Sequence, residues 1–193
     1  MKKFVTLFTD SYEELKSVRT ITAAAMFAAI GIILRVFSID VGNYIRIGFS
    51  GIPNEMMAYL FGPAVGGLFS GGLDILKYLI KPTGAFFPGF TLVTILSGIM
   101  YGTMYYKRPI TLKRVFLTKF LVMVICNMVL NTLCLSILYG KGFMVLLPAR
   151  ALKNIIMWPI DSMIFYTLTK TLETMGVFKM IGKSPAAGIK SKP

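Results

Sequence analysis

A stripe of charged and polar side chains runs through an apolar, glycine-rich stretch of the sequence, residues 71–89 (GGLDILKYLIKPTGAFFPG). Asp74, Lys77, Tyr78 and Lys81 stand at positions i, i+3, i+4 and i+7, which share one face of an α-helix. Ionisable groups in a membrane helix are costly unless they pair, reach the headgroups or line a wet cavity. The stripe therefore indicates a ligand-facing surface or, for Asp74, an internal pair with one of the lysines.

Two other apolar segments carry polar residues at helical spacing. One contains Asn127 and Asn131, and the other contains Arg150, Lys153, Asn154, Met157, Trp158 and Asp161. Three such faces are hard to explain as lipid-facing surface, so we expect a shared polar pocket to which Arg35 and Asn54 also contribute. Arg and Lys bind anions through charge-assisted hydrogen bonds. An anionic ligand is therefore expected.

The residue types present argue against common catalytic and metal chemistry. The chain has no histidine, which excludes Ser-His-Asp and Cys-His catalysis and His-rich metal sites. Cys126 and Cys134 lie within apolar stretches and are interpreted as buried thiols. We predict no catalytic residue, metal site or cofactor.

The elements that must position these residues are membrane helices. Of the 193 residues 55% are hydrophobic, and Lys and Arg outnumber Asp and Glu by 21 to 8. A basic and very apolar chain is typical of a membrane protein rather than of a nucleic-acid binder. Segments with the length and apolarity of a span lie at about 20–39, 47–61, 63–80, 87–106, 115–139 and 146–172. The second and third of these could instead form a hairpin that does not fully cross.

Charge predicts the orientation of this six-helix bundle. Six spans place both termini on one side, and 14 of the 21 Lys and Arg residues then lie at that side. By the positive-inside rule it is cytoplasmic. We expect a cytoplasmic segment 1–19, a membrane domain 20–172 and a cytoplasmic basic tail 173–193. The other seven cations face outward: Arg35, Arg46, Lys77, Lys81, Lys141, Arg150 and Lys153.

Two further patterns indicate contacts. The connection KPTGAFFPGF, residues 81–90, places three phenylalanines among prolines and glycines and is interpreted as an ordered outer lid or an interfacial anchor. In the first span Ala24 lies one turn from Ala28, and Ala25 one turn from Ala29. Small residues at this spacing let membrane helices approach closely, so this stripe could dock a partner subunit.

The pattern as a whole resembles a known family. Six short spans with cytoplasmic termini and an Ala-x-x-x-Ala first helix are similar to the S components of energy-coupling factor (ECF) vitamin transporters. Residues 46–92 and the segment LPARALKNIIMWPIDSM, residues 147–163, resemble the folate-specific members. The resemblance covers about residues 15–172. It implies an all-α integral membrane protein in the plasma membrane of a bacterium.

The resemblance also implies a function and partners. Such a subunit captures folate outside the cell and delivers it inward together with a membrane T component and two ATPases. The chain has no G-x-x-x-x-G-K-[ST] motif, so ATP hydrolysis is expected only in the partners. The family's alanine motif maps onto Ala24, Ala25, Ala28 and Ala29 as the face toward the T component.

Folate chemistry suggests roles for the pocket residues. We hypothesise that Asp74 and either Asn131 or Asn154 bind the pterin edge and that Trp158 stacks on the ring. The two tail carboxylates would meet basic residues: Arg35, Arg46, Lys77 and Arg150.

Alternative functions stay open at this stage. The chain could bind another anionic vitamin such as pantothenate, or be a membrane protein without a ligand. It could also be a membrane enzyme that uses Asp161 or Glu55 as acid or base, although neither has a second carboxylate near it in sequence. Glu55 itself could contact the ligand, pair with Arg46 or be a protonated acid.

Overall fold

Helices occur at all six positions where spans were predicted in a computed structural model of the chain, which describes residues 2–41, 45–82, 85–140 and 142–180. The helices are α1 (Lys2–Glu14), α2 (Val18–Val36), α3 (Ile52–Phe61), α4 (Pro63–Ile80), α5 (Pro88–Tyr105), α6 (Leu112–Val122), the π-helix η1 (Met123–Leu130), α7 (Asn131–Tyr139), α8 (Phe143–Thr174) and α9 (Val177–Met180). Three features were not predicted: the N-terminal helix α1, the short helix α9, and an antiparallel ribbon of β1 (Ile39–Val41) and β2 (Ile45–Ile47).

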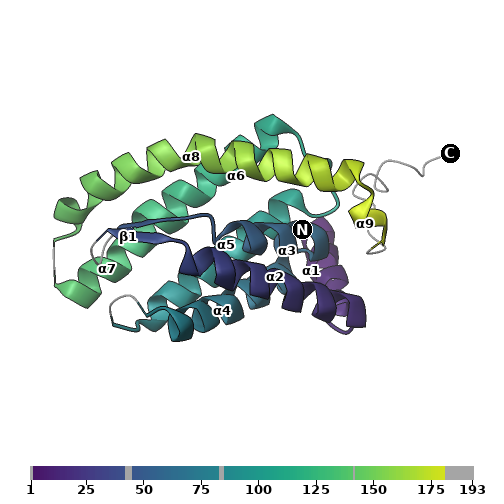
Figure 1. Cartoon of the computed structure of the whole chain (residues 1–193), viewed down its shortest axis with the longest axis horizontal. Helices are drawn as coiled ribbons and strands as arrows, with labels where there is room; N and C mark the ends of the chain where they lie inside the picture. Colours follow the sequence, from purple (N-terminus) through teal and green to yellow (C-terminus); the bar gives the residue numbers. More distant parts are fainter. Residues whose placement is uncertain (1, 42–44, 83–84, 141, 181–193) are drawn as a thin grey trace.

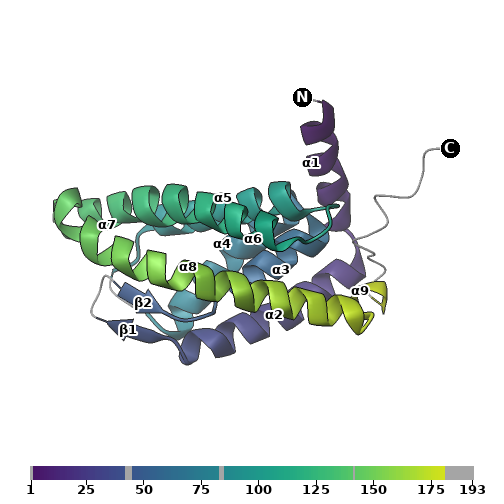
Figure 2. The same ribbon diagram turned by 90° about the horizontal axis from the view of Figure 1, so that it is seen from above.

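The long helices α2, α4, α5 and α8 and the continuous stretch α6–η1–α7 lie side by side along the long axis of the molecule, whereas α1 projects across it (Figures 1 and 2). The β-ribbon and the α4–α5 and α7–α8 connections lie at one end, called here the ribbon end, and α1 and α9 lie at the other (Figures 1 and 2). The first and last described helices of the chain therefore lie at the same end of the molecule.

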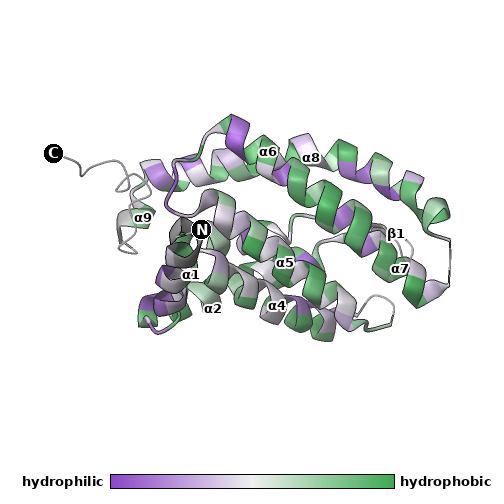
Figure 3. Cartoon of the chain, turned by 180° about the vertical axis from the view of Figure 1, so that it is seen from behind, coloured by the Kyte–Doolittle hydropathy of each residue, from purple (hydrophilic) through white to green (hydrophobic). Residues whose placement is uncertain are grey.

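Three helical stretches of the described chain are long and apolar enough to cross a membrane: Val18–Val36, Leu112–Tyr139 and Phe143–Thr174. Most residues of the long helices are apolar, and polar residues gather at the α1–α2 junction and the α5–α6 connection (Figure 3). Helix α3 has ten residues and rises only about 15 Å, half of the hydrocarbon thickness. Non-helical backbone at membrane depth is tolerated where it lines a cavity, and Gly48, Ser50 and Gly51 before α3 do so.

The core is built around α3, in which all ten residues are buried. Its Met57 belongs to one cluster of buried side chains with Tyr105 of α5 and Phe165 of α8. Helix α3 turns into α4 at Gly62, whose φ of 91° lies in the left-handed region that favours glycine. Ser11 of α1 is fully buried against this turn, and its hydroxyl donates to the carbonyl of Phe61 at 2.7 Å.

Helix α4 packs closely on α5 because glycines face each other. A Cβ at Gly98 would lie 2.5 Å from the carbonyl oxygen of Gly66, so only glycine fits there. Close contact between these helices fixes the polar face of α4 relative to the hydroxyl-bearing face of α5.

Candidate substrate-binding cavity

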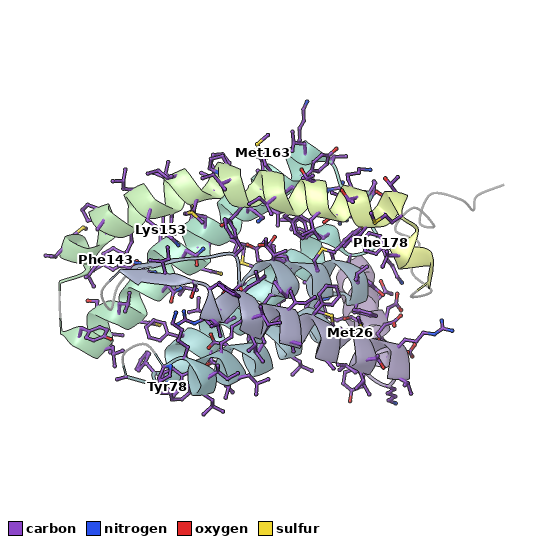
Figure 4. All side chains as sticks on the ribbon, in the orientation of Figure 1. Met26, Tyr78, Phe143, Lys153, Met163 and Phe178 are labelled. Atoms are coloured by element: carbon purple, nitrogen blue, oxygen red, sulfur yellow. The ribbon has the colours of Figure 1, made fainter. Side chains whose placement is uncertain are left out.

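A cavity of about 400 Å³ lies among α2, α3, α4, α5, η1, α7 and α8. Its lining includes Gly48 beside the ribbon, Phe86 in the α4–α5 connection and Tyr139 at the end of α7. The cavity therefore reaches the ribbon end. Figure 4 shows Tyr78 of α4 and Lys153 of α8 in that half of the molecule.

The structure brings eight of the ten predicted substrate-binding residues to this one cavity. They are Arg35, Asn54, Asp74, Lys77, Tyr78, Asn131, Arg150 and Asn154. The side chain of Arg46 lies outside the described part of the structure, although its backbone pairs with Asp40 in the ribbon. Trp158 is absent from the described lining.

The position of Trp158 corrects the stacking hypothesis. Its indole Nε1 donates to the backbone carbonyl of Phe116 at 3.1 Å, and its ring packs edge-on against Phe116 and tilted against Phe120. Both phenylalanines belong to α6. A residue one turn from Asn154 is rotated by about 40° on the helix, enough to turn it from the cavity to the α6–α8 interface.

Basic side chains tie the ribbon end together. Arg35 is buried, with 1% of its surface exposed, and its guanidinium donates to the Ser38 hydroxyl and, at 3.2 Å, to the Lys81 carbonyl. Lys81 Nζ donates back to the Ser38 carbonyl at 2.9 Å, and Lys77 Nζ donates to the carbonyl of Ser50. These contacts fix two ammonium groups and a guanidinium on one wall.

The opposite wall comes from α8 and the π-helix. Arg150 Nη2 lies 3.4 Å from the backbone carbonyl of Asn127 in η1. A π-helical turn widens the helix and often marks a functional site, and η1 here contributes Cys126 and Asn127 to the lining. Guanidinium and ammonium groups form charge-assisted hydrogen bonds with anions, so the two basic walls are suited to an anionic ligand.

Sequence reasoning missed a polar face on α5. Thr91, Thr94, Ser97 and Tyr101 all line the cavity, and Thr91 Oγ1 donates to Asp74 Oδ2 at 3.0 Å. Their spacing of three to four residues was a usable signal, but hydroxyl side chains are common in membrane helices. The Asp74 carboxylate is thus held by a hydroxyl group of α5. This contact was not among the partners expected for Asp74, which were a ligand or a neighbouring lysine.

Aromatic side chains close the ribbon end of the cavity. Tyr78 and Phe86 form a tilted ring pair with centroids 5.1 Å apart, and Phe87 and Phe90 form an edge-to-face pair at 5.8 Å. All four line the cavity. The connection predicted as a lid therefore supplies flat apolar surface to the site, which Trp158 does not.

The deep end of the cavity, called here the floor, is formed by Asn54, Glu55, Tyr101 and Asp161. Glu55 pairs with Lys119 of α6, Nζ to Oε1 3.1 Å, and both are over 90% buried. Lys119 also donates to the backbone carbonyl of Asp161 at 2.8 Å. The partner of Glu55 is therefore Lys119, which sequence reasoning did not consider.

The predicted docking stripe divides into two faces. Ala25 and Ala29 are exposed, whereas Ala24 and Ala28 are partly covered, and Ala24 packs against the core cluster. Of the two pairs, only Ala25 and Ala29 are therefore exposed on the outside of the bundle.

The groups that line the cavity are suited to binding a small polar ligand. The described residues contain no group of three or more His, Cys, Asp or Glu side chains placed to hold a metal ion. What the cavity offers is basic walls, aromatic surface and a set of buried hydrogen-bonding groups, which is the composition of a site for a small polar ligand.

Comparisons with known proteins agree with this description. The sequence profile of the family "ECF transporter, substrate-specific component" matches residues 19–169. The chain is 33% identical to "Folate transporter FolT" of Clostridium novyi (strain NT) over 169 residues, 88% of this chain and 98% of that protein. It is 30% identical to "Folate transporter FolT" of Leuconostoc mesenteroides subsp. mesenteroides over 156 residues, 78% of this chain and 84% of that one.

A solved structure shares the fold. The structure described as "Crystal structure of FolT bound with folic acid" superposes with a TM-score of 0.74 at 31% sequence identity, covering 80% of this chain and 95% of that one. This likeness confirms the predicted all-α membrane bundle, to which the ribbon is a small addition. The chain belongs to the family of substrate-specific components of ECF transporters.

Proposed function

We propose that this chain is the folate-binding subunit of an ECF transporter. The observation that carries the proposal is the convergence of Arg35, Lys77 and Arg150 on one cavity that also presents aromatic rings. Folate carries two carboxylates and a flat pterin, so it matches both features. The names of the two relatives and of the solved structure support the same ligand.

The proposed cycle begins at the ribbon end. With α1 and α9 on the cytoplasmic side, as the positive-inside rule favours, the cavity reaches the outer face of a bacterial plasma membrane. Folate would enter there with its tail carboxylates held by the basic walls. Segments 1–19 and 173–193 would be cytoplasmic, and no cofactor is required.

Transport would need partners, because the chain lacks a phosphate-binding loop. We propose a membrane T component that docks on the exposed Ala25 and Ala29 of α2, and two ATPases bound to it. ATP hydrolysis in those subunits would drive release of folate to the inside.

Calorimetric titration of the purified protein tests the proposal. We expect stoichiometric binding of folate and no competition by pantothenate. Calorimetry is preferable to tryptophan fluorescence because the single tryptophan packs on α6.

A matched pair of variants locates the site. Lys77→Met removes a buried cavity cation and should weaken folate binding by about tenfold or more, the size of one charge-assisted hydrogen bond. Lys113→Met removes an exposed cation outside the cavity and should leave binding unchanged. Absence of folate binding to the unmodified protein, or tighter binding of pantothenate, would refute the proposal.

A further inference from the structure

Helix α1 is separate from the cavity, because none of its described side chains lines it. The helix has 13 residues, which corresponds to a length of about 20 Å, too short to cross the hydrocarbon of a membrane. It projects across the long axis of the molecule, and its N-terminal part extends beyond the neighbouring helices (Figure 2). It also precedes residues 19–169, the part of the chain that matches the family profile. Its role therefore has to be found outside the substrate site.

Helical spacing separates the described side chains of α1 into two faces. One face carries the apolar and aromatic side chains together with the buried hydroxyl of one serine: Leu7, Phe8, Ser11 and Tyr12. The opposite face is polar: Thr6, Thr9, Asp10, Glu13 and Glu14. Such a division is typical of a helix that lies at a boundary between apolar and aqueous surroundings.

Ser11 shows which face of α1 is turned toward the bundle. Its hydroxyl donates to the carbonyl of Phe61 and accepts from the amide of Ala64, and both groups lie at the turn between α3 and α4. Leu7 and Phe8 stand four and three residues before Ser11, on the same face of the helix, and both are partly exposed. Because the bundle runs from this end into the membrane, the face that meets the bundle points into the lipid where α1 extends past the neighbouring helices.

A second contact fixes the rotation of α1 about its own axis. Asp10, on the polar face, pairs with Lys107 of the α5–α6 connection, Nζ to Oδ2 2.5 Å. Tyr12 stands at the edge of the apolar face and is 60% exposed. Tyrosine side chains are enriched at the level of the lipid headgroups, where one end of the ring is apolar and the other is wet. The exposed Tyr12 therefore suits the surface of a bilayer.

The cations around α1 complement an anionic membrane surface. Lys16 and Arg19 follow the helix and are exposed, and the sequence places Lys2 and Lys3 at its start. Anionic lipids of the cytoplasmic leaflet attract basic residues that lie next to a membrane helix. The carboxylates of α1 belong to its polar face, which leaves the apolar face free of negative charge.

We infer that α1 is an amphipathic helix that lies in the plane of the cytoplasmic membrane surface, with Leu7 and Phe8 inserted among the lipid chains and the neighbouring basic residues bound to anionic lipid headgroups. The inference uses the orientation proposed above and does not depend on which substrate the cavity binds. Because Ser11 and Asp10 attach α1 to the bundle, a helix held in the surface sets the depth of this end of the bundle in the bilayer.

Spin labels on four consecutive residues test the inference. The full-length protein is reconstituted into vesicles of phosphatidylethanolamine and phosphatidylglycerol and labelled in turn at one of four introduced cysteines: Thr6→Cys, Leu7→Cys, Phe8→Cys and Thr9→Cys. The two native cysteines are buried, and the unmodified protein measures their background labelling. Collisions of each label with oxygen, which concentrates in lipid, and with a water-soluble nickel chelate give its depth. Circular dichroism checks folding, and Leu7 and Phe8 share a face, so either one alone decides the test.

We expect the labels at Leu7 and Phe8 to lie about 5–10 Å into the boundary between headgroups and acyl chains, open to oxygen and protected from the nickel chelate. The labels at Thr6 and Thr9 should be open to the nickel chelate, which makes them the matched controls. Vesicles of phosphatidylcholine alone should reduce the depth of the two inner labels, because they remove the anionic attraction.

Three outcomes would overturn the inference. Equal access of the nickel chelate to all four labels would show that α1 lies in water. Low access of both reagents to the labels at Leu7 and Phe8 would place this face against protein, and protection that appears only after addition of a partner subunit would assign the face to that partner. Equal depths in the two kinds of vesicle would refute the binding of anionic headgroups.

Discussion

Lys119 on α6 and Glu55 on α3 form an ion pair in the interior of the bundle, Nζ to Oε1 3.1 Å, with side-chain exposures of only 5% and 8%. The two residues are 64 positions apart in the sequence. Helix α3 is short and wholly buried. The ion pair connects the N-terminal part of α3, which carries Glu55, to α6, which carries Lys119.

Lys119→Met should destabilise the folded protein by about 3–5 kcal/mol, because it leaves the Glu55 carboxylate buried without its countercharge. Thermal unfolding in detergent or lipid measures the loss. Adding Glu55→Gln should restore most of the stability, since the uncompensated charge is then gone. A single variant as stable as the unmodified protein would show that the pair does not hold α3.

Gly98→Ala should destabilise the α4–α5 contact by about 1–3 kcal/mol, the usual cost of overpacking. Its new methyl group would lie 2.5 Å from the Gly66 carbonyl oxygen, and backbone cannot move aside as a side chain can. Gly72→Ala is the matched control on α4, because a Cβ there meets nothing within 4 Å. Equal unfolding temperatures for the two variants would contradict the packing described here.

Much of the site could be predicted because helical spacing is local. Asp74, Lys77 and Tyr78 share a face in any α-helix, so the structure needed only to turn that face inward. The same reasoning failed for Trp158, because whether a residue beside a polar stripe faces the cavity or the next helix depends on a rotation of a few tens of degrees. That rotation is set by packing against Phe116 and Phe120.

Long-range partners could not be predicted. Glu55 was expected to contact the ligand, to pair with Arg46 or to be a protonated acid. In the structure it pairs with Lys119. Nothing in the sequence pattern links the second span to the fifth. The α1 helix was missed for a similar reason, because its anchor is the contact of Ser11 with the turn at Gly62, which exists only in the folded chain.

Ser11→Ala should lower the free energy of unfolding by about 1–3 kcal/mol. The hydroxyl donates to the Phe61 carbonyl and accepts from the amides of Ala64 and Val65 at 3.0 and 3.2 Å, so its loss leaves buried backbone groups unsatisfied. Ser17→Ala is the control, because Ser17 precedes α2 without a side-chain capping bond. Chemical denaturation monitored by circular dichroism measures both, and a larger effect at Ser17 would refute the anchoring role.

The last prediction separates binding from transport. Ala25→Leu combined with Ala29→Leu enlarges two exposed residues on α2 without touching the cavity. If a T component docks there through close helix contact, as small residues allow, the added bulk should reduce uptake of labelled folate by cells that contain the complete transporter by about tenfold or more. The folate affinity of the purified subunit should not change.

The control for this experiment is Gly72→Leu, which places the same bulk on an exposed position of α4 where a Cβ meets nothing within 4 Å. A general effect of added Leu on insertion or lipid packing would lower uptake in both variants. Specific docking on α2 predicts that only the alanine variant loses uptake and co-purification with the T component. Uptake retained by the alanine variant would place the docking surface elsewhere on the bundle, because two leucines cannot be accommodated where helices meet through alanine methyl groups.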